Sequence, residues 1–137
     1  MAWDDGEKKN PWRSDKDKGP VDLDAVVRDL QRRIAGLFRG GRVVDLGGGH
    51  GLLAQVMLLL NDSSPDAVVI DKALPASAAK VHDAILAAWP RLTGRVAFIE
   101  GEMDRLEVLE TDVVVSSHAC GHLTDVVLDR AADARAR

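Results

Sequence analysis

After position 42 the chain alternates short apolar runs with longer segments in which apolar residues recur at helical spacing. The short runs are rich in β-branched residues and have the length of buried strands. They cover 42–46, 67–71, 95–100 and 112–116. Helices are predicted after the first, second and fourth runs, at 51–60, 75–89 and 122–134. We therefore predict an α/β fold in which helices flank a parallel sheet of about four strands.

The stretch 1–41 has a different pattern from the rest of the chain. Residues 1–20 mix charged residues with Gly, Pro, Asn and Ser, a composition that predicts disorder. From 21 to 41 apolar residues recur every three or four positions behind an acidic N-cap, which predicts one helix ending at Gly40 and Gly41. We therefore expect a disordered leader, a single helix and a sheet-containing domain at 42–137.

Composition and charge narrow the class of protein. The 137 residues suffice for one domain with a core, and the net charge is −4. Residues 43–137 contain 8 Lys and Arg against 14 Asp and Glu, a balance of −6 that predicts no basic face for nucleic acid. Cys120 is the only cysteine, so the chain forms no internal disulfide. A polar start and the lack of an apolar run of membrane-spanning length predict a cytoplasmic protein with no transmembrane segment.

The segment VVDLGGGHGL, at 43–52, passes from a predicted strand through a glycine-rich turn into a predicted helix. Glycine permits positive φ and close approach of a ligand, and the helix start offers free N–H groups. The spacing Gly47-x-Gly49-x-Gly51 differs from the dinucleotide pattern G-x-G-x-x-G, whose last glycine would fall where this chain has leucine. Asp45 lies two residues before the first glycine. The sequence predicts a nucleotide-type cofactor site, and a turn without a ligand is the alternative.

The motif Asp45-x-Gly47-x-Gly49-x-Gly51 resembles the first motif of the Rossmann-like methyltransferases that use S-adenosylmethionine (SAM). The resemblance covers about residues 42–134. It implies that the turn wraps the methionine part of SAM, with the acid ordering the turn and the ammonium group. Folds of this family normally contain more strands than can be counted here. We therefore expect an incomplete Rossmann-like sheet that forms the cofactor-binding part of a methyltransferase domain.

Acidic residues follow the second and third predicted strands. Asp71 ends the second run, at the distance from Gly51 where an acid can accept hydrogen bonds from ribose hydroxyls, and a turn-stabilising acid is the alternative. The family resemblance implies that Glu102 reaches the adenine amino group and that Met103 lies against the adenine ring. Glu100 is the competing acid, and a solvated turn acid is the simpler alternative.

The segment after the fourth predicted strand combines histidine, cysteine and a Thr-Asp pair. It reads His118-x-Cys120-Gly121-x-x-Thr124-Asp125-x-x-Leu128. This pattern is similar to the H-x-C-G-x-x-T-D-x-x-L segment of a methyltransferase branch that includes eukaryotic tRNA 2′-O-methyltransferases. The resemblance implies that Ser117, His118 and Cys120 face the substrate, with His118 positioning or deprotonating a nucleophile. Alternatively, Cys120 is a small buried residue, and Thr124 and Asp125 cap the last helix.

Other chemistries have little support in the sequence. His118, Cys120 and His122 include one thiol and lack a second ligand pair at zinc-finger spacing, so we predict no metal site. The chain has no Ser-centred nucleophile elbow and no Gly-Lys-Ser/Thr of a Walker loop.

The N-terminal part of the chain, up to about position 40, has a resemblance of its own. Its recognisable pieces are Met1-Ala2-Trp3, Asn10-Pro11-Trp12, Gly19-Pro20, Asp22-Leu23-Asp24 and Gly36-Leu37-Phe38. Together they resemble the cytoplasmic N-terminus of the HflK family, whose members are membrane-anchored partners of a bacterial protease. The resemblance implies a membrane protease complex as a partner of the leader.

These observations predict a SAM-dependent methyltransferase whose acceptor is RNA, protein or a small molecule. The acidic balance argues against RNA, whereas the resemblance of the 118–128 segment argues for it. One alternative is a fragment that binds the cofactor without catalysis. Another is an HflK-like interaction segment fused to such a fragment.

Overall fold

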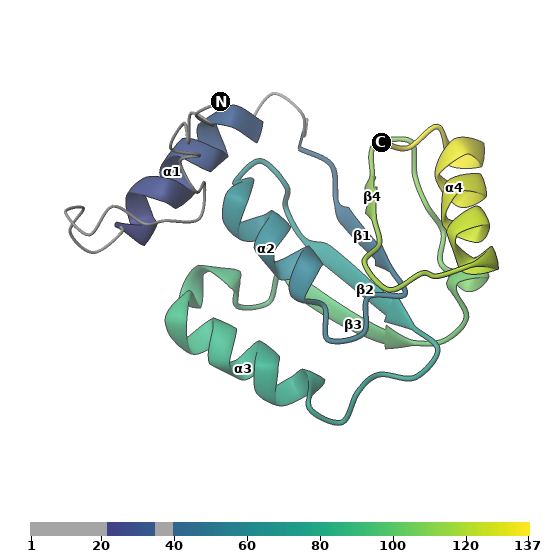
Figure 1. Ribbon diagram of the computed structural model, residues 1–137, viewed down its shortest axis with the longest axis horizontal. Helices are drawn as coiled ribbons and strands as arrows, with labels where there is room; N and C mark the ends of the chain where they lie inside the picture. The colour runs from purple at the N-terminus through teal and green to yellow at the C-terminus, as the bar shows by residue number, and fades with distance from the viewer. Residues whose placement is uncertain (1–21, 35–39) are drawn as a thin grey trace, which may run out of the picture.

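The computed structural model describes residues 22–34 and 40–137, and these form an α/β fold (Figure 1). The strands are β1 (Val43–Leu46), β2 (Ala67–Asp71), β3 (Val96–Glu100) and β4 (Val113–Val115). The α-helices are α1 (Leu23–Ile34), α2 (Leu52–Leu60), α3 (Ala78–Ala88) and α4 (His122–Ala134). Short 3₁₀ turns lie at Pro90–Leu92 and Met103–Arg105. The predicted alternation of strands and helices is confirmed.

The four strands form a parallel sheet in the order β3-β2-β1-β4. In the register, Val43 of β1 lies opposite Ala67 of β2 and Val113 of β4, while Asp71 of β2 lies opposite Glu100 of β3. Because all strands run the same way, their carboxyl ends meet at one edge of the sheet. The segments that follow β1, β2, β3 and β4 therefore gather along that edge.

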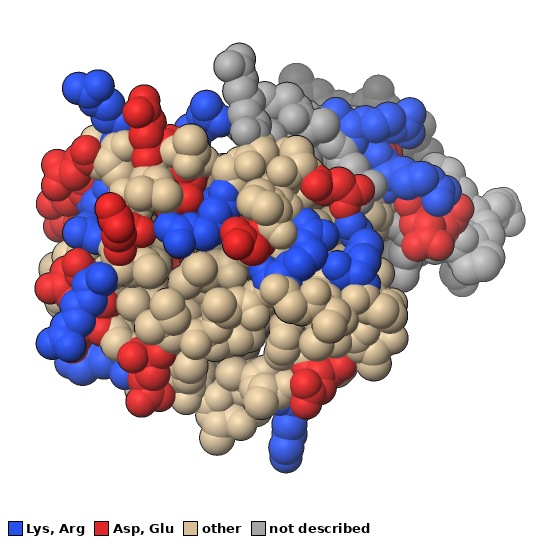
Figure 2. Space-filling view, turned by 180° about the vertical axis from the view of Figure 1, so that it is seen from behind, with Lys and Arg blue, Asp and Glu red and all other residues tan. Residues whose placement is uncertain are grey.

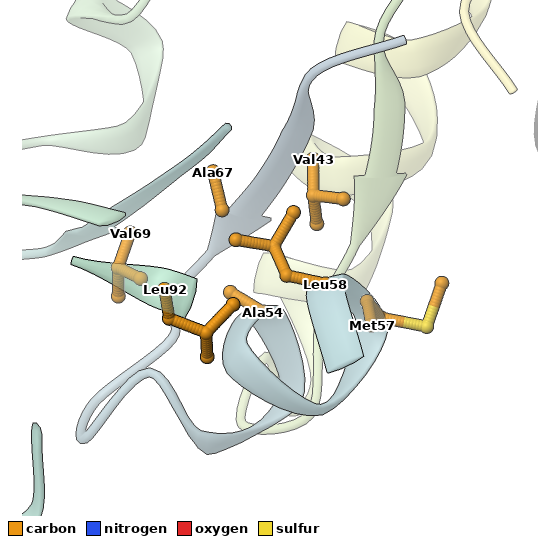
Figure 3. Packing of buried hydrophobic residues seen from close by; sticks show 7 residues of the cluster. All are labelled: Val43, Ala54, Met57, Leu58, Ala67, Val69 and Leu92. Carbon is orange, nitrogen blue, oxygen red and sulfur yellow. The ribbon is translucent and has the colours of Figure 1, made fainter. Parts of the chain in front are cut away.

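Two hydrophobic clusters hold the layers together, one on each face of the sheet. On one face α2 packs on β1 and β2, and the seven buried residues of this cluster are drawn in Figure 3. On the other face Val44, Leu46 and Ile70 pack against α4 and the segment after β3. Successive residues of β1 point to opposite faces, and both faces are covered. This explains why the strand is apolar without interruption, apart from Asp45.

The ends of several elements differ from those predicted. The expected strand at 67–71 and helix at 122–134 agree with β2 and α4. The helix predicted at 75–89 begins later, because Pro75 lies in a turn whose carbonyl accepts the N–H of Ala78 at 2.8 Å. The acidic cap of the first helix is confirmed, since Asp22 Oδ1 accepts the N–H groups of Asp24 and Ala25 at 3.0 and 3.1 Å. The predicted disorder at 1–20, and the stretch just before Gly40, lie outside the described residues.

The last residue of the chain lies along the outer edge of β4. The Arg137 N–H donates to the Asp112 carbonyl at 3.1 Å, and the Val114 N–H donates to the Arg137 carbonyl at 2.7 Å. This is the hydrogen-bond pattern of a parallel strand pair. The same end of β4 is fixed by an ion pair between the half-buried Arg42 and the buried Asp112, in which Arg42 Nη2 lies 2.7 Å from Asp112 Oδ2.

The surface carries mixed charges. On the face seen in Figure 2, basic and acidic side chains lie interspersed at the left and in a band across the middle, with a few more at the bottom, and uncharged residues lie between them. No helix within the described residues is long and apolar enough to cross a membrane.

Candidate cofactor site

The glycine-rich turn between β1 and α2 folds back over the end of β2. The N–H groups of Gly47 and Gly48 donate to the Ile70 carbonyl at 2.8 and 3.2 Å, and Gly51 N–H donates to the Gly48 carbonyl at 2.8 Å. Gly47, Gly49 and Gly51 have φ values of +68°, +54° and +69°. Residues with a side chain rarely adopt this left-handed region, so the turn needs glycine at all three positions.

The glycines of the turn divide into a packed pair and an open pair. A Cβ on Gly48 would lie 2.6 Å from Val69 Cγ1, and one on Gly51 would lie 2.8 Å from Phe98 Cε1. By contrast, the nearest atoms to a Cβ on Gly47 or Gly49 are Met103 Sδ and His118 Cδ2, each at 3.6 Å. The open side of the turn therefore faces the segments after β3 and β4. Gly51, predicted to bind cofactor, has its Cα against the core and offers only its backbone.

Asp45 is fully buried beside this turn, with its carboxyl carbon 2.7 Å from where a Cβ on Gly48 would lie. Its Oδ2 accepts the Ala54 N–H of the first turn of α2 at 3.3 Å. Its Oδ1 has no hydrogen-bond partner among the described residues. Burial raises the pKa of Asp45 to about 6, although the Ala54 N–H and the charge of His118 oppose the rise.

Asp71, at the end of β2, holds the glycine turn in place. Its Oδ2 accepts the Gly49 N–H at 2.9 Å, and its Oδ1 accepts the Ala73 N–H at 3.3 Å. The bond with Ala73 is that of an acid that stabilises a turn. The alternative considered from the sequence, a turn-stabilising acid, therefore describes part of the role of Asp71. Each oxygen retains capacity for a further hydrogen bond, because a carboxylate oxygen has two lone pairs.

The residues after β3 lie at different depths. Met103 is half-buried, packs on the cluster of Leu46 and Ile70, and presents its sulfur to Gly47. Glu102 is exposed, and its Oε1 lies 3.2 Å from Lys72 Nζ across the ends of β2 and β3. Such an exposed ion pair contributes little energy, so the carboxylate of Glu102 is free to exchange partners.

The competing acid, Glu100, is occupied by the segment after β2. Its Oε2 accepts the Leu74 N–H at 3.2 Å. The two acids therefore differ in what they bind: Glu100 contacts the backbone of the neighbouring segment, whereas Glu102 contacts a lysine side chain.

The segment after β4 is anchored to β1 by Ser116, whose Oγ donates to the Leu46 carbonyl at 2.6 Å. This contact brings the His118 ring against Gly49, with Cδ2 3.6 Å from where a Cβ would lie. Ser117 and His118 are exposed. The Cys120 thiol is exposed as well, so the expectation that it is a small buried residue is wrong.

Thr124 does not cap α4, contrary to the alternative considered from the sequence. Its Oγ1 donates to the Ala119 carbonyl at 2.9 Å, so it orders the preceding segment. The N-cap position is Gly121, and no side chain caps it. Asp125 lies in the first turn of α4, where a negative charge is favoured by the helix dipole.

The structure adds two side-chain contacts around the turn that the sequence analysis missed. His50 Nε2 lies 2.8 Å from Ser77 Oγ, and Gln55 Oε1 lies 2.8 Å from His82 Nδ1. The sequence contained a signal for the contact of Gln55 with His82, because Gln55 is the only polar residue of α2. No group of three or more His, Cys, Asp or Glu in the described part of the chain is arranged to hold a metal ion.

The arrangement combines a positive-φ turn, a buried carboxylate with one oxygen that has no partner among the described residues, and a second carboxylate one strand away. This donor set suits a ligand that carries both a cation and hydroxyl groups, because carboxylates are acceptors for both. It suits a pyrophosphate poorly, because two negative groups lie beside the turn.

Comparison with known families identifies the class of this fold. Residues 22–136 match the family described as methyltransferase domain. The match covers most of the chain, and the chain belongs to that family. Residues 1–41 also match the HflK N-terminal family, described as bacterial membrane protein N terminal. The resemblances to a methyltransferase domain and to the HflK N-terminus, both predicted from the sequence, are confirmed. No match to a curated protein was found by sequence.

Solved structures share the fold at low sequence identity. An uncharacterized protein from Listeria monocytogenes serotype 4b has 14% identity and a TM-score of 0.50, over 80% of this chain and 45% of its own. M. capricolum TrmK, solved with S-adenosyl-homocysteine, has 19% identity and a TM-score of 0.47, over 72% of this chain and 44% of its own. The Trypanosoma brucei PRMT1 enzyme–prozyme complex with AdoHcy has 20% identity and a TM-score of 0.47, over 68% and 28%. The chain therefore spans less than half the length of each of these proteins.

Proposed function

We propose that this protein binds SAM at the glycine turn and transfers its methyl group to a nucleophilic acceptor. The observation that carries the proposal is the buried carboxylate of Asp45, whose Oδ1 has no partner among the described residues. A buried acceptor without a partner is costly, and a bound ammonium group would offset that cost. Membership of the methyltransferase-domain family supports the same function.

Each predicted site residue has a role in this proposal. Asp45 attracts the ammonium group, and the turn residues Gly47, Gly49 and Gly51 enclose the methionine part with their backbone. Asp71 accepts hydrogen bonds from the ribose hydroxyls while it holds the Gly49 N–H. Met103 offers an apolar surface to the adenine ring, and Glu102 exchanges Lys72 for the adenine amino group.

His118 is the residue that we propose to handle the proton of the acceptor. When bound, SAM supplies a methyl group on a sulfonium centre that leaves as a neutral thioether. A neutral imidazole accepts the acceptor's proton as the new bond to the methyl carbon forms. Ser117 and Cys120 are exposed on the same segment and line the approach of the acceptor. The remaining contribution is positioning of the acceptor in line with the methyl group.

Calorimetric titration of the full chain with SAM and with S-adenosylhomocysteine tests the cofactor. Gly49→Val should abolish binding, because it adds a side chain toward His118 on a backbone with φ +54°. Gly94→Val is the matched control, with φ +73° and nothing within 4 Å of the added Cβ. Lack of binding by the unaltered chain refutes the cofactor, and binding retained by Gly49→Val refutes the assigned turn.

Transfer of a labelled methyl group to RNA, protein and small-molecule acceptors tests the reaction and separates the acceptor classes. His118→Ala should slow transfer by roughly 10²–10⁴-fold with cofactor affinity retained, and His122→Ala is its control. Unchanged transfer in His118→Ala would remove that residue from the mechanism. Binding without transfer to any acceptor favours the alternative, a fragment that binds the cofactor only.

A second candidate function belongs to the N-terminal segment, because residues 1–41 match the HflK N-terminal family. In this proposal the leader at 1–20 and the helix that follows recruit a membrane protease complex, and residues 42–137 form the cofactor-binding domain. Pull-down from bacterial membrane extracts should retain the complex with the full chain and lose it with a chain lacking residues 1–20. Retention with neither chain contradicts recruitment, and equal retention with both contradicts the role of residues 1–20 in it.

A further inference from the structure

Gln55 is a buried polar residue in an otherwise apolar helix. It lies one turn after the glycine segment in α2, whose sequence is LLAQVMLLL, and it has no exposed surface. An unpaired amide in this position would be costly, so both ends of the side chain need partners. The Gln55 Nε2 group donates to the Gly51 carbonyl at 3.1 Å, and Oε1 faces His82 Nδ1 at 2.8 Å.

The pairing of Gln55 fixes the tautomer of His82. Because the amide N–H group of Gln55 is directed to Gly51, its Oε1 faces the histidine and can only accept. His82 must therefore carry a proton on Nδ1, whether the ring is neutral or charged. The bond joins α3 to the start of α2.

The remaining contacts close a ring around Gly51. The His82 ring packs edge-on against Phe98 of β3, with ring centroids 5.3 Å apart and an interplanar angle of 68°. Phe98 in turn packs on Gly51, where a Cβ would lie 2.8 Å from its Cε1. Gly51, Gln55, His82 and Phe98 thus form a closed set of contacts, which we call the Gly51 ring. Three of its members come from α2, α3 and β3 and surround the left-handed residue that ends the turn.

We propose that the Gly51 ring holds the glycine turn in the conformation that binds the cofactor, with Gln55 and His82 as positioning residues. The inference rests on the proposed SAM site. The proposal follows from where the contacts lie. The ring contacts the packed side of the turn, whereas Gly47 and Gly49 present the open side, where the cofactor is proposed to bind. Without the ring, Gly51 loses side-chain contacts that restrict it, and because glycine allows a wide range of φ, the turn that it ends is held less firmly.

Two substitutions of His82 separate hydrogen bonding from packing. His82→Asn keeps an N–H donor at the position of Nδ1 but loses the aromatic contact, whereas His82→Phe keeps a ring against Phe98 but loses the donor. The affinity for S-adenosylhomocysteine should fall by roughly two- to thirty-fold in His82→Phe, in the range of positioning effects, and by less in His82→Asn. Asp83→Asn, at an exposed neighbour on α3, is the control and should not change the affinity. Affinities in both His82 variants that equal the affinity of Asp83→Asn overturn the proposal.

A measurement without ligand keeps this inference distinct from the proposed function. Gln55→Met preserves the side-chain length and removes both hydrogen bonds, so the amide ¹H–¹⁵N resonances of Gly49 and Gly51 should shift or broaden in the ligand-free protein. The resonance of Gly94, which lies far along the chain from the turn, should remain. Unshifted glycine resonances in Gln55→Met overturn the ring's role. If the unaltered chain binds neither SAM nor S-adenosylhomocysteine, the SAM site is refuted, and the resonances alone decide whether the ring holds the turn.

Discussion

At the scale of single residues, the two aspartates beside the turn differ in how the fold treats their charge. Asp71 accepts two backbone N–H groups, from Gly49 and Ala73, and is only partly buried. Asp45 accepts one and is fully buried. A carboxylate removed from water with one donor is destabilised in its charged form, which is the physical cause of its raised pKa. The fold therefore keeps a costly charge where the cofactor is proposed to bring a cation.

Because the pKa of Asp45 is raised, the contribution of this residue to the stability of the folded protein depends on pH. Its value rises from 3.8 to about 6, so the folded state holds the proton more tightly than the unfolded state, and stability falls as pH rises through that interval. A shift of this size corresponds to about 3 kcal/mol. Asp45→Asn should therefore raise the free energy of unfolding by up to about 3 kcal/mol at pH 7 and by little below pH 4, while it weakens cofactor binding.

Urea unfolding of both proteins at several pH values measures this difference, and the other carboxyl groups cancel between them. A pH-independent difference would show that Asp45 does not titrate in this interval. For the unaltered chain, SAM affinity should decline as pH falls below about 6, the value to which the Asp45 pKa is raised. Affinity that is flat across that pH would remove Asp45 from ammonium binding.

At the scale of elements, α2 connects the glycine turn to the larger hydrophobic cluster, because the helix begins at the turn and its side chains pack in the cluster. Leu58 is fully buried in this cluster, and Leu92 and Val43 are members of the same cluster (Figure 3). Residues that anchor α2 therefore also fix the direction of its N-terminal amide groups at the site. The apolar run that predicts the helix is the same run that supplies this anchor.

Leu58→Ala should lower the free energy of unfolding by about 2–5 kcal/mol, because it removes buried methyl groups and leaves a cavity. Val56→Ala on the same helix is the control, since its side chain is 43% exposed, and it should change stability by about 0.5 kcal/mol or less. Chemical denaturation monitored by circular dichroism gives both values. Similar losses in the two variants would mean that α2 is not held by the cluster.

The sequence predicted the elements of this helix layer better than their ends. Periodicity located the helices, because the apolar face is what the core selects. The sequence prediction placed Pro75 in the first turn of a helix, a position that suits proline. In the structure the Pro75 carbonyl accepts the Ala78 N–H in the turn before α3. The contact of Gln55 with His82 depends on how α3 lies against α2, which no local pattern contains.

At the scale of the whole molecule, parallel topology explains why the candidate site was predictable. The glycine turn, Asp71, Met103 and His118 are far apart in sequence, and the alternation of strands and helices alone implies that they meet at one edge. Their mutual contacts are a different matter. The hydrogen bond from Gly49 to Asp71 and the ion pair of Glu102 with Lys72 depend on side-chain directions that spacing does not determine.

The placement of Arg137 along β4 has a practical consequence for anyone who handles this protein. Its backbone already pairs with Asp112 and Val114 in parallel register, so residues joined after it would be directed along the remaining edge of β4, toward Ser116 and the segment that bears His118. A purification tag or reporter attached there is therefore not a neutral addition. A long spacer rich in glycine and serine, which forms strands poorly, would keep such an attachment away from the cofactor side of the sheet.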